Sequence, residues 1–293
     1  MPNGDGTLLA TLRRVTPEPL RPLLGRLRRA LMGQAVPSTP TSSPALEVAP
    51  DDPDALVAPR AMWALVGAVD ADYVRVGEEF RQLFIASGLQ PDHAFLDVGC
   101  GIGRAAAPLV DYLSPHGLYR GFDVMAEAIA WCNERIGTDP RFQFLHADLH
   151  SDRYNPGGTT LARDYVFPYA DGTFDFVWLG SVFTHMLAAD QARFASEIAR
   201  VLKPGGISVI SYYLIDEEAR AKAGSPDIAF DFAHALEDCW TATPDLPESV
   251  IAYEIERVLA QYDSLGFDVT EQRLGVWRRE ALQDQDILVA RKR

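Results

Sequence analysis

Residues Phe95 to Arg104 read "FLDVGCGIGR", and this stretch decides the fold. Four residues typical of a buried strand run into glycines at alternate positions, and Asp97 lies two residues before the first of them: Gly99, Gly101 and Gly103. Glycine lets a backbone turn sharply and approach a ligand without Cβ clashes. A following helix offers unpaired N–H groups and a positive end. The stretch therefore predicts a ligand-binding turn between a strand and a helix.

Strand and helix patterns alternate on both sides of this turn. We predict strands at 94–99, 119–124, 142–148, 174–180 and 207–214, and helices at 103–113, 126–136 and 189–202. A helix at about 248–265 precedes two further strands, 267–277 and 286–292, which we expect to pair antiparallel at one edge. The pattern predicts an α/β fold: a seven-stranded, mostly parallel sheet with an antiparallel edge strand and helices on both faces. Ligands bind such sheets at the carboxyl ends of the strands.

Composition narrows the class of protein. The chain has 293 residues and a formal net charge of −14, which opposes a nucleic-acid-binding surface because phosphate binding needs a basic footprint. Three cysteines at no metal-ligand spacing favour a reducing compartment, so we expect a cytoplasmic protein. No apolar run approaches the ~18 residues of a membrane span, and the arginine-containing N-terminus has no apolar region typical of a signal peptide.

Three segments differ in composition. Residues 1–33 form a basic amphipathic segment, and 34–60 form a linker rich in proline and serine. Residues 61–293 form the main domain, with loop insertions at 149–173 and 215–247. Long loops at the ligand end of a sheet are commonly functional, but a solvated surface elaboration is an equal alternative for both insertions. The sequence leaves the oligomeric state open.

Acidic residues close three successive predicted strands. The glycine spacing is G-x-G-x-G, whereas the pyrophosphate fingerprint of dinucleotide enzymes is G-x-G-x-x-G. A carboxylate at Asp97 is unfavourable beside a diphosphate and useful beside a cationic ligand. Asp123 closes the second strand, where it can accept from ribose hydroxyls, and Asp148 closes the third, where it can accept from an adenine amino group. This arrangement indicates an adenosyl ligand without phosphates.

Five stretches in this order resemble the motifs of class I S-adenosylmethionine-dependent methyltransferases. They are "LDVGCGIGR", "GFDV", "HADL", "FDFVWLGSVFTHM" and "EIARVLKPGGISVIS". The likeness runs from about residue 75 to the C-terminus and implies a Rossmann-like fold. The closing "GVW…QDILVARK" resembles a subgroup found among glycan- and natural-product-modifying enzymes.

The resemblance implies S-adenosylmethionine as the cofactor. Asp97 and the glycine loop would hold its methionine part, Asp123 its ribose, and Asp148 with the Leu149 backbone the adenine edge. Val124 or its neighbour Phe122 would flank the adenine. The cofactor residues expected from the resemblance are Asp97, Gly99, Cys100, Gly101, Gly103, Arg104, Asp123, Val124, Asp148, Leu149 and Gly180.

Three residues are candidates for catalysis. His185 follows the fourth predicted strand, where related enzymes place a residue facing the acceptor, and an ordinary histidine pKa suits a general base. A histidine that only packs or caps a helix is the alternative. Tyr212, beside Tyr213 at the end of the fifth strand, and Tyr154 in the first insertion complete the set. Because "LGSVF" replaces the "NPPY"-type motif of amino-N transferases, we expect transfer to a hydroxyl of a small-molecule or glycan-type acceptor.

Two other functions and a metal site are weighed on the sequence. A non-catalytic module that binds S-adenosylmethionine or a nucleoside would keep the strand-end acids and need no His185. A nicotinamide-dependent oxidoreductase is opposed by the glycine spacing and by Asp97. His146, Asp148 and His150 share one strand face, but Asp148 has an adenine role and no further acid or histidine converges there. We therefore expect no metal.

The basic N-terminal segment generates the first prediction. Residues 20–32 pair a leucine stripe with four arginines, so the predicted helix at 22–32 either lies on an anionic membrane or packs on the domain or a second subunit. We expect packing, because the stripe is about three turns long, Gly25 weakens the free helix and the acidic domain is repelled by the same membrane. A version starting near residue 60 should lose melting temperature. Pelleting of the full chain with anionic vesicles, lost on truncation, would contradict packing.

Overall fold

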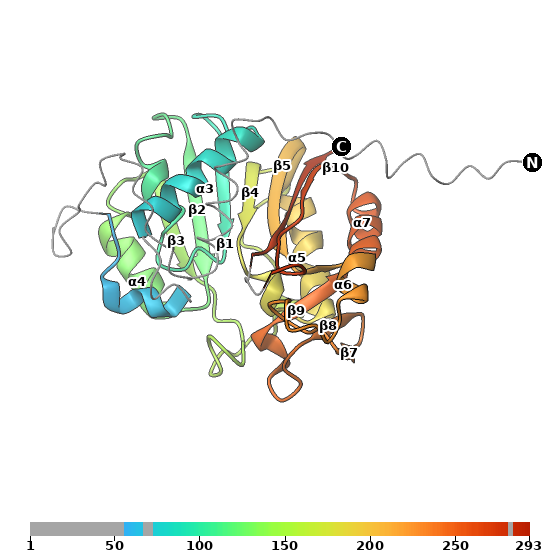
Figure 1. Cartoon of the computed structure of the whole chain (residues 1–293). Coiled ribbons are helices and arrows are strands. Elements are labelled where there is room, and N and C mark those ends of the chain that lie inside the picture. The colour runs from blue at the N-terminus through green and yellow to red at the C-terminus, as the bar shows by residue number, and fades with distance from the viewer. Residues whose placement is uncertain (1–55, 67–72, 281–283) are drawn as a thin grey trace, which may run out of the picture.

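A twisted seven-stranded sheet forms the centre of the molecule (Figure 1). The computed structural model describes residues 56–66, 73–280 and 284–293, so the predicted helix at 22–32 and most of the linker lie outside the described residues. The strand order is β10-β11-β5-β4-β1-β2-β3. The strands are β1 (Ala94–Val98), β2 (Leu118–Asp123), β3 (Phe142–His146), β4 (Phe174–Leu179), β5 (Leu202–Tyr212), β10 (Phe267–Arg273) and β11 (Asp286–Lys292).

The strand directions confirm the predicted α/β fold. β1, β2, β3, β4 and β5 pair parallel, whereas β11 pairs antiparallel with both β5 and β10. The reversed strand β11 therefore lies one place in from the edge that β10 forms.

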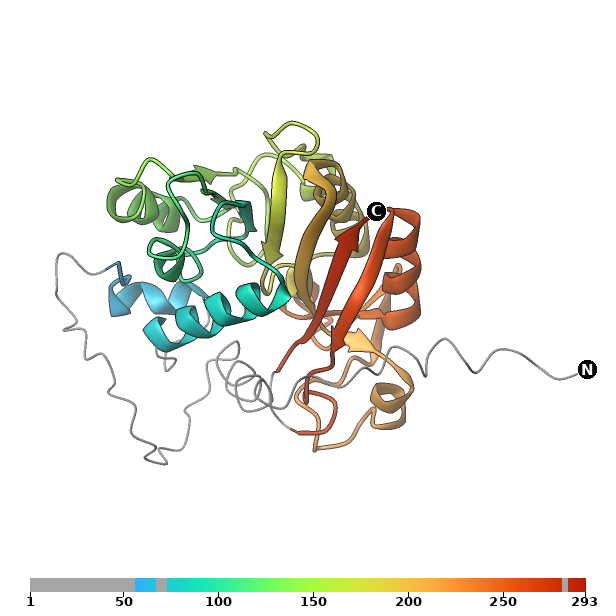
Figure 2. The same ribbon diagram turned by 90° about the horizontal axis from the view of Figure 1, so that it is seen from above.

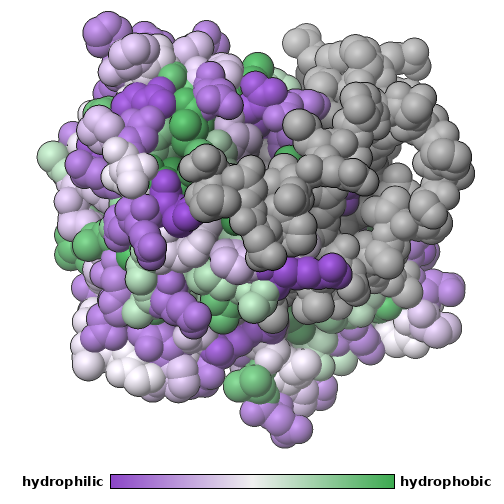
Figure 3. All heavy atoms as spheres, turned by 90° about the vertical axis from the view of Figure 1, so that its left-hand side faces the viewer, coloured by the Kyte–Doolittle hydropathy of each residue, from purple (hydrophilic) through white to green (hydrophobic). Residues whose placement is uncertain are grey.

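Helices cover both faces of the sheet (Figure 2). They are α3 (Tyr73–Ser87), α4 (Ala126–Arg135), α5 (Ala188–Val201), α6 (Glu217–Ala221) and α7 (Ile255–Ser264). Because successive strand residues point to opposite faces, Phe95 belongs to the core that contains residues of α3 and α4, while Leu96 belongs to the core that contains residues of α5 and α7. In the described ranges no helix combines the length and the apolar character needed to span a bilayer. The described part of the face in Figure 3 is mainly hydrophilic, with hydrophobic residues in small groups.

Two predicted helices differ in the structure. Residues 103–113 form successive turns with one short 3-10 helix, Ala107–Leu109, because Pro108 has no N–H to donate in the middle of the segment. The helix predicted at 248–265 begins only at Ile255, and residues Ile251–Glu254 form strand β9. The side chains of this strand alternate between two cores: Ile251 packs in the main core and Ala252 in a second one. That period of two requires a strand.

The insertion after β5 builds a second, small sheet. Its order is β6-β9-β8-β7, in which β6 is Leu214–Ile215, β7 is His234–Leu236 and β8 is Cys239–Thr241. Its core joins Tyr213, Phe232 and Trp277. The region predicted as either a functional loop or a solvated surface elaboration is therefore partly a folded layer against the end of β5.

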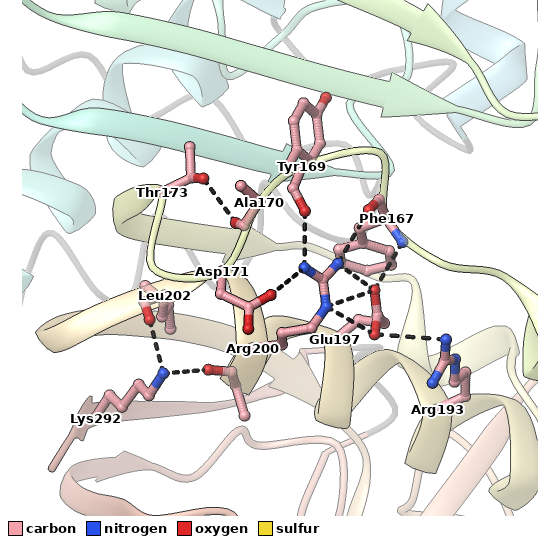
Figure 4. A network of polar contacts seen from close by, with 11 residues as sticks. Phe167, Tyr169, Ala170, Asp171, Thr173, Arg193, Glu197, Arg200, Leu202 and Lys292 are labelled. Atoms are coloured by element: carbon pink, nitrogen blue, oxygen red, sulfur yellow. Dashed lines mark hydrogen bonds and ion pairs between the residues drawn. The ribbon is translucent and has the colours of Figure 1, made fainter.

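Arg200 on α5 fixes the connection that leads into β4 (Figure 4). Its guanidinium donates to the carbonyl oxygens of Tyr169 and Phe167, at 2.8 and 3.0 Å, and pairs with Glu197 at 2.6 Å. The ammonium of Lys292 on β11 donates to the carbonyls of Ala199 and Leu202 where α5 meets β5. These contacts hold α5 against the sheet and keep the preceding loop in place.

A buried ion pair joins the small sheet to β11. The side chains of Arg278 and Asp286 are both 0% exposed, and Arg278 Nη2 lies 2.7 Å from Asp286 Oδ1. Arg278 also donates to the carbonyls of Leu214 and Gly275, and Asp286 Oδ2 accepts from Leu214 N–H and Trp277 Nε1–H. The pair thus holds the second layer against the main sheet.

This ion pair leads to a stability prediction. Arg278→Met should lower the free energy of unfolding by about 3–5 kcal/mol, because Asp286 would stay buried without its cation. Arg279→Met is the matched control: Arg279 pairs with Glu218 on the surface, where an ion pair is worth less than about 1 kcal/mol. Urea unfolding measures both variants, and equal losses would contradict the anchoring role.

Candidate active site

A cavity lies at the carboxyl ends of β1, β2 and β4. A ligand was predicted at this end of the sheet. The structure brings most of the predicted residues to its wall: Asp97, Gly99, Cys100, Gly101, Arg104, Asp123, Val124, Leu149, Tyr154, Gly180 and His185.

The three glycines of the first motif all adopt positive φ angles, of 79°, 51° and 73°. A Cβ on Gly99 would lie 2.3 Å from Val182 Cγ2, so the loop needs glycine both for its conformation and for space. A Cβ on Gly103 would meet Ile136 Cδ1 at 2.7 Å, and Gly103 is absent from the cavity wall. Gly103 therefore serves packing against α4 rather than ligand contact.

Asp97 presents a buried carboxylate oxygen that lacks a partner. Its side chain lines the cavity, the residue is 1% exposed, and Tyr119 Oη donates to Oδ2. Oδ1 has no hydrogen-bond partner among the described residues. Burial raises the pKa of Asp97 to about 7, and the charge of Asp123 contributes to the rise. The hydrogen bond from Tyr119 and the charge of Arg104 both act to lower this pKa. An orphan carboxylate oxygen in this position fits the cationic methionine part of S-adenosylmethionine.

Asp123 joins the glycine loop to the start of α4. Its Oδ2 accepts the Gly101 N–H at 2.8 Å and its Oδ1 accepts the Met125 N–H at 2.9 Å. Burial raises the pKa of Asp123, and these backbone hydrogen bonds oppose the rise. Each carboxylate oxygen keeps a second lone pair, which suits it to accept from ribose hydroxyls.

Arg104 contributes a buried cation to the same wall. Its guanidinium lies 5.3 Å from the centre of the Phe80 ring. Burial lowers the pKa of Arg104 to about 10, while Tyr73 and Asp97 raise it. It therefore stays charged at neutral pH and partly balances the two carboxylates.

Asp148 is not among the residues that line the cavity, although its neighbour Leu149 is. The carboxylate is exposed and accepts from Thr159 Oγ1 at 2.8 Å and from Asn155 Nδ2 at 3.3 Å. His146 contacts the Val124 carbonyl and His150 contacts Asp152, so the three side chains do not converge. Within the described ranges, no group of three or more possible ligands is placed to hold a metal.

His185 is held in one tautomer. Its Nδ1 lies 2.9 Å from the Glu248 carbonyl oxygen, which can only accept, so Nδ1 carries the proton. The lone pair is then on Nε2, which lies 3.4 Å from Tyr154 Oη. Burial lowers the pKa of His185 to about 4, so the ring is neutral at physiological pH.

The structure does not bring Tyr212 to the cavity. Tyr212 is fully buried, and its hydroxyl lies 3.1 Å from the Tyr262 hydroxyl. Tyr213 is buried in the core of the small sheet, beside Trp277. Both tyrosines belong to cores because the small sheet covers the end of β5, and this layer was not foreseen.

Several wall residues were missed by the sequence analysis: Trp178, Ser181, Val182, Asp190 and Glu248. Ser181 has a φ of 60°, and its N–H donates to Ser211 Oγ while its Oγ lies 3.2 Å from Gln285 Oε1. Its position between Gly180 and Val182 in the "LGSVF" stretch was the available signal. Glu248 had none, because it is 63 residues away from the His185 that it contacts.

Comparison with known proteins identifies the domain that contains most of the cavity. The family model described as "Methyltransferase domain" matches residues 96–210. Residues 96–210 form a class I S-adenosylmethionine-dependent methyltransferase domain. The cofactor of this class is S-adenosylmethionine, and the unpartnered Asp97 oxygen and the glycine loop of the methyltransferase domain fit it.

Curated methyltransferases are similar in sequence to part of this chain. Methyltransferase GfsG of Streptomyces halstedii is 32% identical over 130 residues, which are 43% of this chain and 40% of that protein. The fatty-acid O-methyltransferase of Mycolicibacterium smegmatis is 31% identical over 152 residues, 50% of this chain and 48% of that protein. The chain therefore spans less than half the length of these curated relatives.

Solved structures are similar as well. The 1,6-didemethyltoxoflavin-N1-methyltransferase of Burkholderia thailandensis, solved with that compound and S-adenosylhomocysteine, has a TM-score of 0.49 at 14% identity. The match covers 87% of this chain and 93% of that chain.

The methyltransferase domain leads to a binding prediction that separates two of the strand-end acids. Asp123→Ala should weaken binding of S-adenosylhomocysteine by roughly 2–3 kcal/mol, the scale of hydrogen bonds to a buried charged group. Asp148→Ala should change it little, because that carboxylate lies outside the cavity wall. Isothermal titration calorimetry measures both. A large loss in Asp148→Ala would restore its predicted adenine role.

Proposed function

We propose that this chain transfers a methyl group from S-adenosylmethionine to a hydroxyl of a small-molecule or glycan-type acceptor, with His185 as the general base. The observation that carries the proposal is the fixed tautomer of His185, whose Nδ1–H is engaged by the Glu248 carbonyl and whose Nε2 carries the lone pair, 3.4 Å from Tyr154 Oη. Both rings line the same cavity as the cofactor residues.

S-adenosylmethionine, when bound, supplies an electrophilic methyl group on a sulfonium. The residues of this chain would hold it by charge and by shape: Asp97 for the amino acid part, Asp123 for the ribose, and the positive-φ glycine loop for close approach of the backbone. Placement of the acceptor against the methyl group would supply much of the rate, because orientation converts a bimolecular encounter into a unimolecular step.

His185 would remove the hydroxyl proton as the acceptor oxygen attacks. A pKa of about 4 makes the imidazole a weak base that is always available in its neutral form at physiological pH. The Glu248 carbonyl oxygen, which accepts the Nδ1–H, would stabilise the imidazolium formed in the transfer. An amine acceptor in its neutral form would not need this base, which is why the arrangement favours a hydroxyl.

The hydroxyl acceptor is proposed from the residues of this cavity and not from the relatives. Their names specify different acceptors, among them a phytyl hydroquinone in Synechocystis sp. and a fatty acid in Mycolicibacterium smegmatis. The saccharide acceptor, the cytoplasmic location and the peripheral membrane contact through residues 20–32 stay predictions.

Kinetics of a His185 variant test the proposal. His185→Ala should lower kcat on the order of 10²-fold and leave the Kd of S-adenosylhomocysteine within about twofold. The active form is the neutral imidazole, so the kcat of the native enzyme at saturating S-adenosylmethionine should fall as pH drops through about 4, the value that burial imposes, rather than near neutrality. The variant should lose this acid limb.

Two further measurements define the outcome. His116→Gln is the matched control, because His116 is exposed and absent from the cavity wall. An unchanged kcat in His185→Ala would transfer the role to positioning alone. Native protein that binds S-adenosylhomocysteine but methylates no sugar, phenol or acid in a screen would favour a binding module.

A further inference from the structure

We propose that Tyr119 is a positioning residue for the cofactor: its hydroxyl holds the Asp97 carboxylate with one oxygen facing the cavity and favours the ionised form of that carboxylate. This inference rests on the proposed use of S-adenosylmethionine. Tyr119 does not line the cavity and lies outside the family motifs. It would therefore act on the cofactor only through Asp97.

The position of Tyr119 depends on a missing side chain. Asp97 on β1 pairs in register with Gly121 on β2, and Tyr119 lies two residues earlier on the same face of β2. A Cβ on Gly121 would lie 3.1 Å from Tyr119 Cε1 and 3.0 Å from Cys100 Sγ. Because glycine leaves this space open, the Tyr119 ring reaches along the strand and its hydroxyl meets Asp97 Oδ2.

Stacking fixes the ring. Tyr119 is 0% exposed and stacks between Phe95, at 5.4 Å between ring centres, and Phe142, at 5.1 Å. The hydroxyl has little freedom to turn away, so Oδ2 of Asp97 is held and the unpartnered Oδ1 is left for a ligand. A cationic amino group reaching this oxygen would find it already oriented.

The charges around Asp97 give this hydrogen bond an electrostatic role. The groups facing Asp97 are Tyr119, Asp123, Arg104, Cys100 and Cys132. Burial raises the pKa of Asp97, the Tyr119 hydrogen bond lowers it, and the charges of Asp123 and Arg104 act in opposite directions. Loss of the Tyr119 hydroxyl would therefore raise the pKa of Asp97. Since a cation binds the ionised carboxylate, affinity near neutral pH would fall and would recover at higher pH.

The test is the pH dependence of S-adenosylhomocysteine binding to the full chain, measured by calorimetry from pH 6 to 8.5. Tyr119→Phe should weaken binding about five- to tenfold at pH 6–7 and less than about twofold at pH 8.5. Tyr112→Phe is the matched control, since it removes a hydroxyl that donates to the Leu89 carbonyl at 2.7 Å. It should leave the Kd unchanged at every pH.

The possible results separate the role of Tyr119 from the proposed function. Equal Kd values for Tyr119→Phe and native protein, or a loss that is the same at all pH values, would overturn the positioning role and leave the proposed function intact. Native protein that binds no S-adenosylhomocysteine at any pH would overturn the proposed function itself. Should Tyr119→Phe not fold alone, it is tested in an Asp97→Asn background. There it should cause no further loss of binding, and a further loss would overturn the inference.

Discussion

The cavity depends on how the chain turns over the end of β2. The N–H groups of Gly99 and Cys100 both donate to the Phe122 carbonyl, at 2.9 and 3.1 Å, and the Gly101 N–H donates to the Asp123 carboxylate. Backbone and side chain at the end of one strand thus hold the loop that follows its neighbour. Parallel pairing of β1 with β2 makes this possible, because it brings both carboxyl ends to the same edge. Asp97 and Asp123 come together as a consequence.

The opposite side of the cavity is built by residues distant in the sequence. Glu248 precedes β9, the strand shared by the main core and the core of the small sheet, and its carbonyl fixes the His185 tautomer. The Arg278–Asp286 pair anchors that small sheet to β11, and the adjacent Gln285 contacts Ser181 on the cavity wall. The insertion after β5 therefore acts as a fixed support for the catalytic candidate. Its stability and the orientation of His185 are coupled through the same strand.

The sequence predicted the features that depend on residues close to one another in the chain. The alternation of strands and helices depends on neighbours a few residues apart, and the sheet confirms it. Gly99 and Gly101 of the glycine loop and the strand-end acids Asp97 and Asp123 line the cavity. Tyr212 was misplaced because alternation along β5 says nothing of a second layer that buries both faces. The start of α7 was predicted too early because the sequence from Ile251 to Glu254 is compatible with a helix. These residues form β9 because they lie between two cores. Asp148 was assigned to the adenine, whereas Thr159 and Asn155 engage its carboxylate outside the cavity wall.

Electrostatics link the opening motif to the choice of ligand. Ionised carboxylates are costly to bury without a partner, and Asp97 keeps one oxygen unpaired beside a second acid, Asp123. A phosphate placed here would add repulsion to that cost, whereas a cation would offset it. The folded chain therefore carries an electrostatic cost at Asp97, which a cationic cofactor would offset. Binding of that cofactor stabilises the folded chain by mass action. The Tyr119 hydrogen bond and the Arg104 charge both lower the pKa of Asp97 and so reduce this cost.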